Sequence, residues 1–194
     1  LYKNGKPFKM SKRAGDFISA QDLLNEVNKD AIRFMMLNRS NDMELDFDFE
    51  KVKEKTKDNP VYYVQYASAR IHSVFRKADE AGITFDKKLA MNEQFETVTH
   101  EAEIKIAKKL AEWPRLVEIA AKTNEPHRIA FYLYELAGDF HSLWNKGNEI
   151  SELRFIQEDN HKASCIKMAM ISAVLVVISS GLDILGVEPA THMN

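Results

Sequence analysis

The stretch DNPVYYVQYASARIHSVFRKADEAG, residues 58–82, has the clearest pattern in this 194-residue chain. Asn59 suits an N-cap, Pro60 suits the first turn, and Gly82 suits the exit of a helix. Between them, apolar residues recur at the three- and four-residue spacing of an amphipathic helix. The sequence therefore predicts one long helix here, as part of a helix bundle.

Similar patterns continue toward the C-terminus. We expect further helices over about 93–111, 114–122, 126–146 and 160–180, opened by Pro114 and Pro126 and closed by Gly147 and Gly181. Glycine and proline are scarce, with seven and five in all, and no strand alternation is sustained. The predicted fold class is therefore all-α, a helix bundle preceded by a loop and connecting helices.

The first 45 residues are organised differently from the bundle. Residues 1–18 read as a loop, and Ser19 followed by Asp22 predicts a capping box at a helix start. Residues 41–50, NDMELDFDFE, are acidic and aromatic and are expected to cross between two domains. We therefore place one domain at 1–45, with the loop and connecting helices, and the bundle at 46–194.

The composition excludes several classes of protein. The single cysteine, Cys165, rules out an internal disulfide and a cysteine-based zinc cluster, so we expect a cytoplasmic protein and no metal site. The longest apolar stretch, residues 168–178, is too short to span a bilayer and predicts a core helix rather than a membrane contact. A net charge of −2 argues against a general nucleic-acid coat, but residues 1–20 hold five Lys/Arg against one Asp.

The basic opening segment FKMSKRAGDF, residues 8–17, has a pattern that suits phosphate chemistry. Lys9 and Lys12 flank Met10 and Ser11 on a loop between glycines. Two ammonium groups on such a loop can close over a triphosphate and stabilise the charge that builds as pyrophosphate leaves. The competing interpretation is an ordinary solvated cationic loop.

The order of motifs resembles the class I aminoacyl-tRNA synthetases. Their Lys-Met-Ser-Lys motif stands at 9–12, and Asp30-Ala31-Ile32-Arg33 differs by one conservative change from the Asp-Ala-Leu-Arg string of one helical anticodon-binding domain. Within this class the chain is most similar to arginyl-tRNA synthetases, on the stretches DNPVYYVQYASARI, YLYELAGDFHSLWNKG and SGLDILGVEPATHM. The resemblance runs over essentially the whole chain.

The resemblance implies an activity for a longer parent protein. In that parent, arginine is activated with ATP and Mg²⁺ and transferred to tRNA(Arg), and Lys9, Met10, Ser11 and Lys12 form part of the ATP site, with both lysines catalytic. The His-x-Gly-His motif of the class is not found here. We therefore expect a C-terminal fragment, monomeric and without activity alone, and with no cofactor of its own.

The long helix predicted at 58–82 carries a candidate RNA contact. Tyr63, Tyr66 and Arg70 lie at i, i+3 and i+7, on one helix face. Two rings and a guanidinium suit unstacked bases, although core packing with satisfied hydroxyl groups is the competing interpretation. The resemblance implies that these three residues contact the anticodon loop, together with Phe140, Trp144 and Met193.

Two alternatives stay open at this point. Cysteinyl-tRNA synthetases also join a Lys-Met-Ser-Lys loop to this type of bundle. A non-catalytic RNA-binding helical module would show the same aromatic helix. Asp139 and His141 lie at i and i+2 on one predicted helix, where their side chains point to different faces, so we expect no acid–base pair between them.

Overall fold

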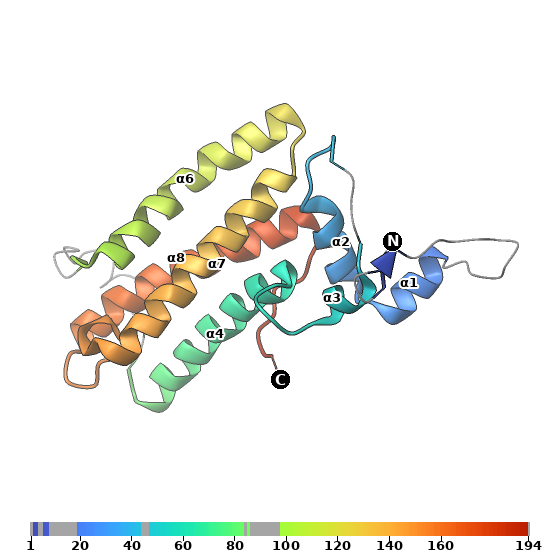
Figure 1. Ribbon diagram of the computed structural model, residues 1–194. Coiled ribbons are helices and arrows are strands. Elements are labelled where there is room, and N and C mark those ends of the chain that lie inside the picture. The colour runs from blue at the N-terminus through green and yellow to red at the C-terminus, as the bar shows by residue number, and fades with distance from the viewer. Residues whose placement is uncertain are drawn as a thin grey trace, which may run out of the picture.

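The computed structural model shows a bundle of long helices with shorter helices at one end (Figure 1). The structure describes residues 2–3, 6–7, 19–43, 47–83, 85 and 98–193. The long helices are α4 (Pro60–Glu80), α6 (Glu101–Thr123), α7 (His127–Glu149) and α8 (His161–Leu185). The short elements are β1 (Tyr2–Lys3), β2 (Lys6–Pro7), α1 (Ala20–Glu26), α2 (Lys29–Leu37), α3 (Phe49–Lys53) and the 3₁₀ turn η2 (Ser151–Leu153). The prediction of an all-α fold is confirmed, because the paired strands β1 and β2 have two residues each.

Two predicted helix starts, at Ser19 and at Pro60, form as the sequence indicates. Ser19 and Asp22 make a capping box, in which the Ser19 hydroxyl accepts from the Asp22 N–H and the Asp22 carboxylate accepts from the Ser19 N–H. Pro60 occupies the first turn of α4, where the backbone N–H that proline lacks would have no partner within the helix. Local side-chain chemistry therefore sets where these helices start.

Helix α7 is the centre of the bundle and packs against α4, α6 and α8. Its fully buried residues Leu133, Leu136 and Phe140 share one core with Ile171 and Ile178 of α8. Burying a large apolar side chain of this kind contributes about 1.5–3 kcal/mol each. The bundle therefore forms a rigid support for side chains on the α4 side of α7.

The predicted break between two helices near Pro114 is wrong. Helix α6 continues through Pro114 from Glu101 to Thr123. Pro114 is exposed, and Trp113 beside it packs on Tyr132 of α7 with ring centroids 5.3 Å apart. A proline removes one helical hydrogen bond, but packing on both sides of it keeps the helix intact. The expected start at residue 93 lies outside the described residues.

The helix ends predicted at Gly147 and Gly181 are also wrong, since both glycines lie inside helices. Both are packed closely against neighbouring parts of the bundle. Gly147 lies within α7, and Gly181 lies within α8 where a Cβ would come within 2.7 Å of the Leu133 side chain. Helix α8 ends instead at Gly186, which has φ +67°, the left-handed conformation that glycine adopts most readily. Gly181 is therefore required by packing and Gly186 by the turn.

Helix α8 is long and apolar enough to cross a membrane by length and composition alone. Half of its most apolar window is buried in this structure, and α8 packs against α4, α6 and α7. This matches the sequence expectation of a core helix for residues 168–178.

Helix α2 packs into the same core as the long helices. Ala31, Ile32 and Phe34 are buried, and α2 contacts α4, α7 and α8. The predicted domain boundary between residues 45 and 46 therefore does not coincide with a gap in the core. It stays a prediction about the parent protein.

Candidate functional site

Arg70 lies between aromatic rings that come from two helices. Its Nη2 donates a hydrogen bond of 2.7 Å to the Tyr66 hydroxyl, and its Cζ lies 4.4 Å from the centre of the Tyr66 ring. The same carbon lies 4.6 Å from the centre of the Trp144 ring of α7. Both distances are within the range of cation–π attraction, so the two rings fix the guanidinium.

His141 of α7 is a further partner of Arg70. Arg70 Nη1 lies 3.2 Å from His141 Nδ1, and His141 Nε2 lies 3.3 Å from the carbonyl oxygen of Tyr63. Because arginine only donates and a carbonyl only accepts, these partners assign the proton of the neutral ring to Nε2. Burial lowers the pKa of His141 to about 4, and the Arg70 charge acts in the same direction. We call Tyr66, Arg70, His141 and Trp144 the ring–guanidinium cluster.

The structure brings Tyr66 and Arg70 together, whereas Tyr63 lies in the contact between α4 and α7. The Tyr63 ring centroid is 4.6 Å from His141 and 5.2 Å from Tyr134, and burial raises the pKa of its phenol. Tyr62 instead stacks on Tyr66, with centroids 5.9 Å apart and planes 12° apart. Tyr63 therefore supports the cluster through His141, and its direct contact with a ligand stays a prediction.

Phe140 has no exposed surface in the structure. Its ring stacks on Phe155 with centroids 5.8 Å apart and planes 9° apart, and it lies 6.4 Å from the ring of Trp144. The expectation that Phe140 touches a bound base is corrected here, because its neighbours cover the ring completely. Phe140 and Phe155 instead support half-buried Trp144 from the core.

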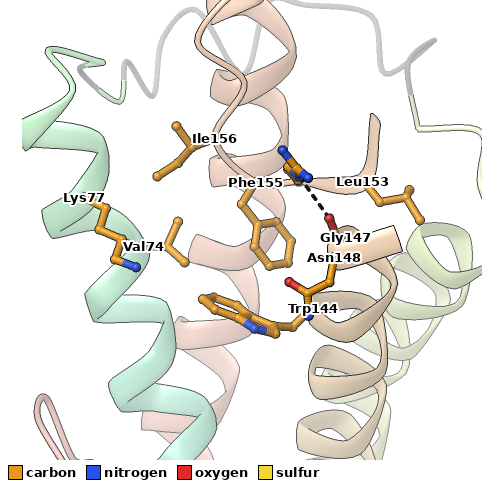
Figure 2. Close-up of a pocket in the computed structure, with 9 residues that line it drawn as sticks. Val74, Lys77, Trp144, Gly147, Asn148, Leu153, Phe155 and Ile156 are labelled. Atoms are coloured by element: carbon orange, nitrogen blue, oxygen red, sulfur yellow. Dashed lines mark hydrogen bonds between the residues drawn. The ribbon is translucent and has the colours of Figure 1, made fainter. Parts of the chain in front are cut away.

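Trp144 also lines a hollow with a volume of about 170 Å³ (Figure 2). The close-up shows Trp144 beneath Phe155, with Lys77 of α4 approaching from the opposite side. Phe155 and Ile156, from the segment after α7, supply apolar walls, and exposed Lys77 and Arg154 supply positive charge. Apolar ring surface beside ammonium and guanidinium groups suits a planar base and its phosphate.

The C-terminal tail, residues 187–193, lies along α4. Gln65 Nε2 donates to the Glu188 carbonyl at 2.9 Å, and Arg76 Nη1 donates to the Thr191 carbonyl at 3.3 Å. Met193 is half-buried and follows Thr191 by two residues. These contacts place the tail along the turns of α4 that also carry the cluster, and a contact between Met193 and RNA stays a prediction.

The predicted phosphate loop lies outside the described residues, and so its geometry is not part of the site. This applies to Lys9, Met10, Ser11 and Lys12. Within the described ranges there is no group of three or more His, Cys, Asp or Glu side chains that could hold a metal ion.

Residues 64–193 match the family described as the DALR anticodon binding domain, which is more than half of the chain. The chain belongs to this family. The matched range includes Tyr66, Arg70, His141 and Trp144, so the whole ring–guanidinium cluster lies within the DALR domain. Asp30-Ala31-Ile32-Arg33 lies before the matched range.

The DALR domain is similar to curated proteins named arginine–tRNA ligase. The identity is 60% over the whole chain for a relative from Ruegeria pomeroyi and 53% for one from Brucella suis. The chain spans about a third of the length of these relatives, 33% in both cases. The activity of those longer proteins is therefore a matter of proposal for this chain.

Solved structures agree with the fold of the DALR domain. An arginyl-tRNA synthetase structure from Campylobacter jejuni superposes with a TM-score of 0.80 and 28% identity, over 98% of this chain and 38% of the other. The arginyl-tRNA synthetase of Thermus thermophilus gives a TM-score of 0.63 at 22% identity, over 94% and 29% of the two chains. The second likeness shows the fold alone.

Sequence reasoning missed three members of the site. His141 was considered only as a partner of Asp139 on its own helix, although its contacts come from α4. Lys77 lies at i+7 from Arg70, so the helical spacing already indicated that it continues the same face. Arg154 lies in an irregular segment, where no periodicity indicates which way a side chain points.

Proposed function

We propose that this chain is the anticodon-reading part of an arginine–tRNA ligase, which acts on tRNA(Arg). The single observation that carries the proposal is a guanidinium held between half-buried aromatic rings, next to an apolar hollow with further cations. Aromatic rings stack on unpaired bases, at about 1–3 kcal/mol per base, and cations bind the phosphates between them. Single-stranded loops are the parts of RNA that offer such bases.

The preorganisation of Arg70 supports this proposal further. An arginine side chain that moves freely before binding loses this freedom when RNA binds, which opposes association by about 0.5–1.5 kcal/mol per immobilised side chain. Here Tyr66, His141 and Trp144 already hold the guanidinium. The remaining donors and the outer surface of the rings are therefore ready for a nucleotide without further ordering.

In the full-length parent, we expect arginine and ATP with Mg²⁺ to form the adenylate before transfer to the tRNA. Lys9 and Lys12 would stabilise the triphosphate during activation, with Ser11 assisting and Met10 fixing the loop. This part of the proposal rests on the sequence motif at 9–12 and on the names of the relatives. Those names also favour the arginyl over the cysteinyl alternative. A monomeric, cytoplasmic enzyme without a membrane contact is the form we propose.

The anticodon proposal is tested by titrating the 194-residue chain with anticodon stem-loop RNAs at a fixed salt concentration, since phosphate contacts make affinity salt-dependent. An arginine stem-loop should bind at least about tenfold more tightly than stem-loops with unrelated anticodons, as expected when one base contact worth about 1.4 kcal/mol is lost. Equal affinity for all loops would reject anticodon reading and leave only non-specific RNA binding.

A further inference from the structure

Asp30 and Arg33, the charged ends of the Asp-Ala-Ile-Arg string, both bind the backbone where α8 passes into the C-terminal tail. The Asp30 carboxylate accepts a hydrogen bond of 3.2 Å from the Glu188 N–H. Arg33 Nε donates to the Leu185 carbonyl, at the last residue of α8. Sequence analysis did not indicate this, because residues more than 150 positions apart meet here.

The Arg33 side chain lies against the turn between these two contacts. Gly186 has φ +67°, and a Cβ there would lie within 3.0 Å of the Arg33 Nε, Cζ and Nη2. The Arg33 guanidinium therefore lies directly against the turn that redirects the chain from α8 into the tail. Figure 1 shows α2 beside this end of α8, with the tail leading away past α4.

The same tail residue links α2 to the helix that carries the candidate site. The Glu188 N–H is bound by Asp30 of α2, and the Glu188 carbonyl is bound by Gln65 of α4, next to Tyr66. Farther along, Arg76 holds the Thr191 carbonyl. Burial lowers the pKa of His72, and the nearby Arg76 and His192 of the tail act in the same direction. The root of the tail thus fixes the path of residues 188–193 along α4.

We propose that Asp30 and Arg33 are positioning residues for RNA binding, which hold the C-terminal tail beside the ring–guanidinium cluster as one wall of the RNA site. This inference rests on the proposed function. Neither side chain needs to touch RNA, since both act through the backbone of the tail. Loss of either contact leaves the tail held on α4 only by Gln65 and Arg76, which weakens the contacts that the tail offers to RNA.

The test is a set of variants of the 194-residue chain titrated with the arginine anticodon stem-loop. Asp30→Ala is expected to weaken binding about five- to tenfold. A purely electrostatic effect would have the opposite sign, because removing a carboxylate reduces repulsion of a polyanion. Asp30→Asn keeps an acceptor oxygen for the Glu188 N–H and should stay within about twofold of wild type. Exposed Asp42→Ala is the control that is matched in charge.

A double-mutant cycle separates positioning from a general loss of stability. The second change is a truncation after Val187, which removes the tail and should itself cost more than tenfold in affinity. In the truncated chain, Asp30→Ala should cause no further loss of affinity for the stem-loop. Arg33→Ala is the substitute variant if Asp30→Ala fails to fold, and it too should cause no further loss in the truncated chain. Faster hydrogen exchange of the Glu188 amide in Asp30→Ala is the accompanying structural signature.

The outcomes are distinct. Unchanged or tighter binding by Asp30→Ala, or an equal loss in the full-length and truncated chains, would overturn the positioning role. If the wild-type chain does not prefer the arginine stem-loop, the proposed function fails instead.

Discussion

Helix α7 has basic neighbours on two sides, and the two sides hold them in opposite ways. On the α6 side, Lys105 binds Asp139 at 2.5 Å and Lys109 pairs with Glu135. On the α4 side, Arg70 is held by rings and a neutral imidazole, and none of the ion pairs found among the described residues involves it. A polyanion therefore meets neutralised charge on one side and an uncompensated cation on the other.

The hollows on the two sides of α7 also differ in the residues that line them. The hollow between α6 and α7 is larger, about 410 Å³, but it is lined by lysines and carboxylates without aromatic rings. The hollow beside Trp144 is only about 170 Å³ and has ring surface with positive charge. The type of lining, rather than the volume, therefore identifies the α4 side as the candidate RNA site.

The largest effect that we expect on the α4 side alone is a loss of folding stability in acid, caused by His141. The pKa of His141 is about 4 in the fold and 6.5 ordinarily, so the unfolded chain binds more protons between these values. The contribution of neutral His141 to the free energy of unfolding has its full value above about pH 6.5. It should fall by up to about 3 kcal/mol as the pH drops to 4. Denaturant unfolding of wild type and His141→Gln at pH 7, 5.5 and 4 checks this. A wild-type curve parallel to that of the variant would contradict it.

The next effect is the loss of the uncompensated cation. Arg70→Met keeps the length of the side chain but removes the charge and the donors. We expect affinity for the arginine stem-loop to fall about 30-fold, or about 2 kcal/mol, as for other charge-assisted contacts. The slope of log affinity against log salt should also become shallower by up to about one unit. An unchanged slope would mean that Arg70 does not meet a phosphate.

A smaller effect is expected from the ring on α7. Trp144→Leu should weaken binding about tenfold, within the range of one base stack. The other tryptophan, Trp113, packs between α6 and α7 and is the matched control. Trp113→Leu should leave RNA affinity within about twofold even if it lowers the melting temperature. A comparable loss of affinity in both variants would indicate a general effect of core packing.

The smallest effect belongs to the ion pairs of the α6 side. Lys105 is exposed and bonded to Asp139, which raises the pKa of its ammonium. Exposed pairs contribute little to stability, and a paired lysine offers little to RNA. Lys105→Ala should therefore change the stem-loop affinity by less than about twofold. A loss as large as that of Arg70→Met would erase the distinction between the two sides.

The sequence predicted the parts of this site that follow from helical spacing. Tyr66 and Arg70 share a face because they are four residues apart, and the caps at Ser19 and Pro60 follow from local chemistry. By contrast, Phe140 was expected at the surface and is covered by Phe155, which lies beyond the end of its helix. Its burial depends on where that later segment packs, and local patterns do not contain this information.

The helix ends illustrate the same limit. Pro114, Gly147 and Gly181 are ordinary breakers by local preference, yet all three lie inside helices. Tertiary contacts decide these cases, as with the Leu133 side chain against Gly181. The contacts of Asp30 and Arg33 with the tail were unpredictable for the same reason, since they join the two ends of the chain.

If the lining of the two hollows decides where RNA binds, RNA binds on the α4 side of α7 and not on the α6 side. Hydrogen exchange of the 194-residue chain, with and without the arginine anticodon stem-loop, tests this most directly. We expect slower exchange within residues 62–77, 141–148 and 187–193, and no change within 101–123. Protection confined to 101–123, or none in the first three ranges under saturating RNA, would contradict it.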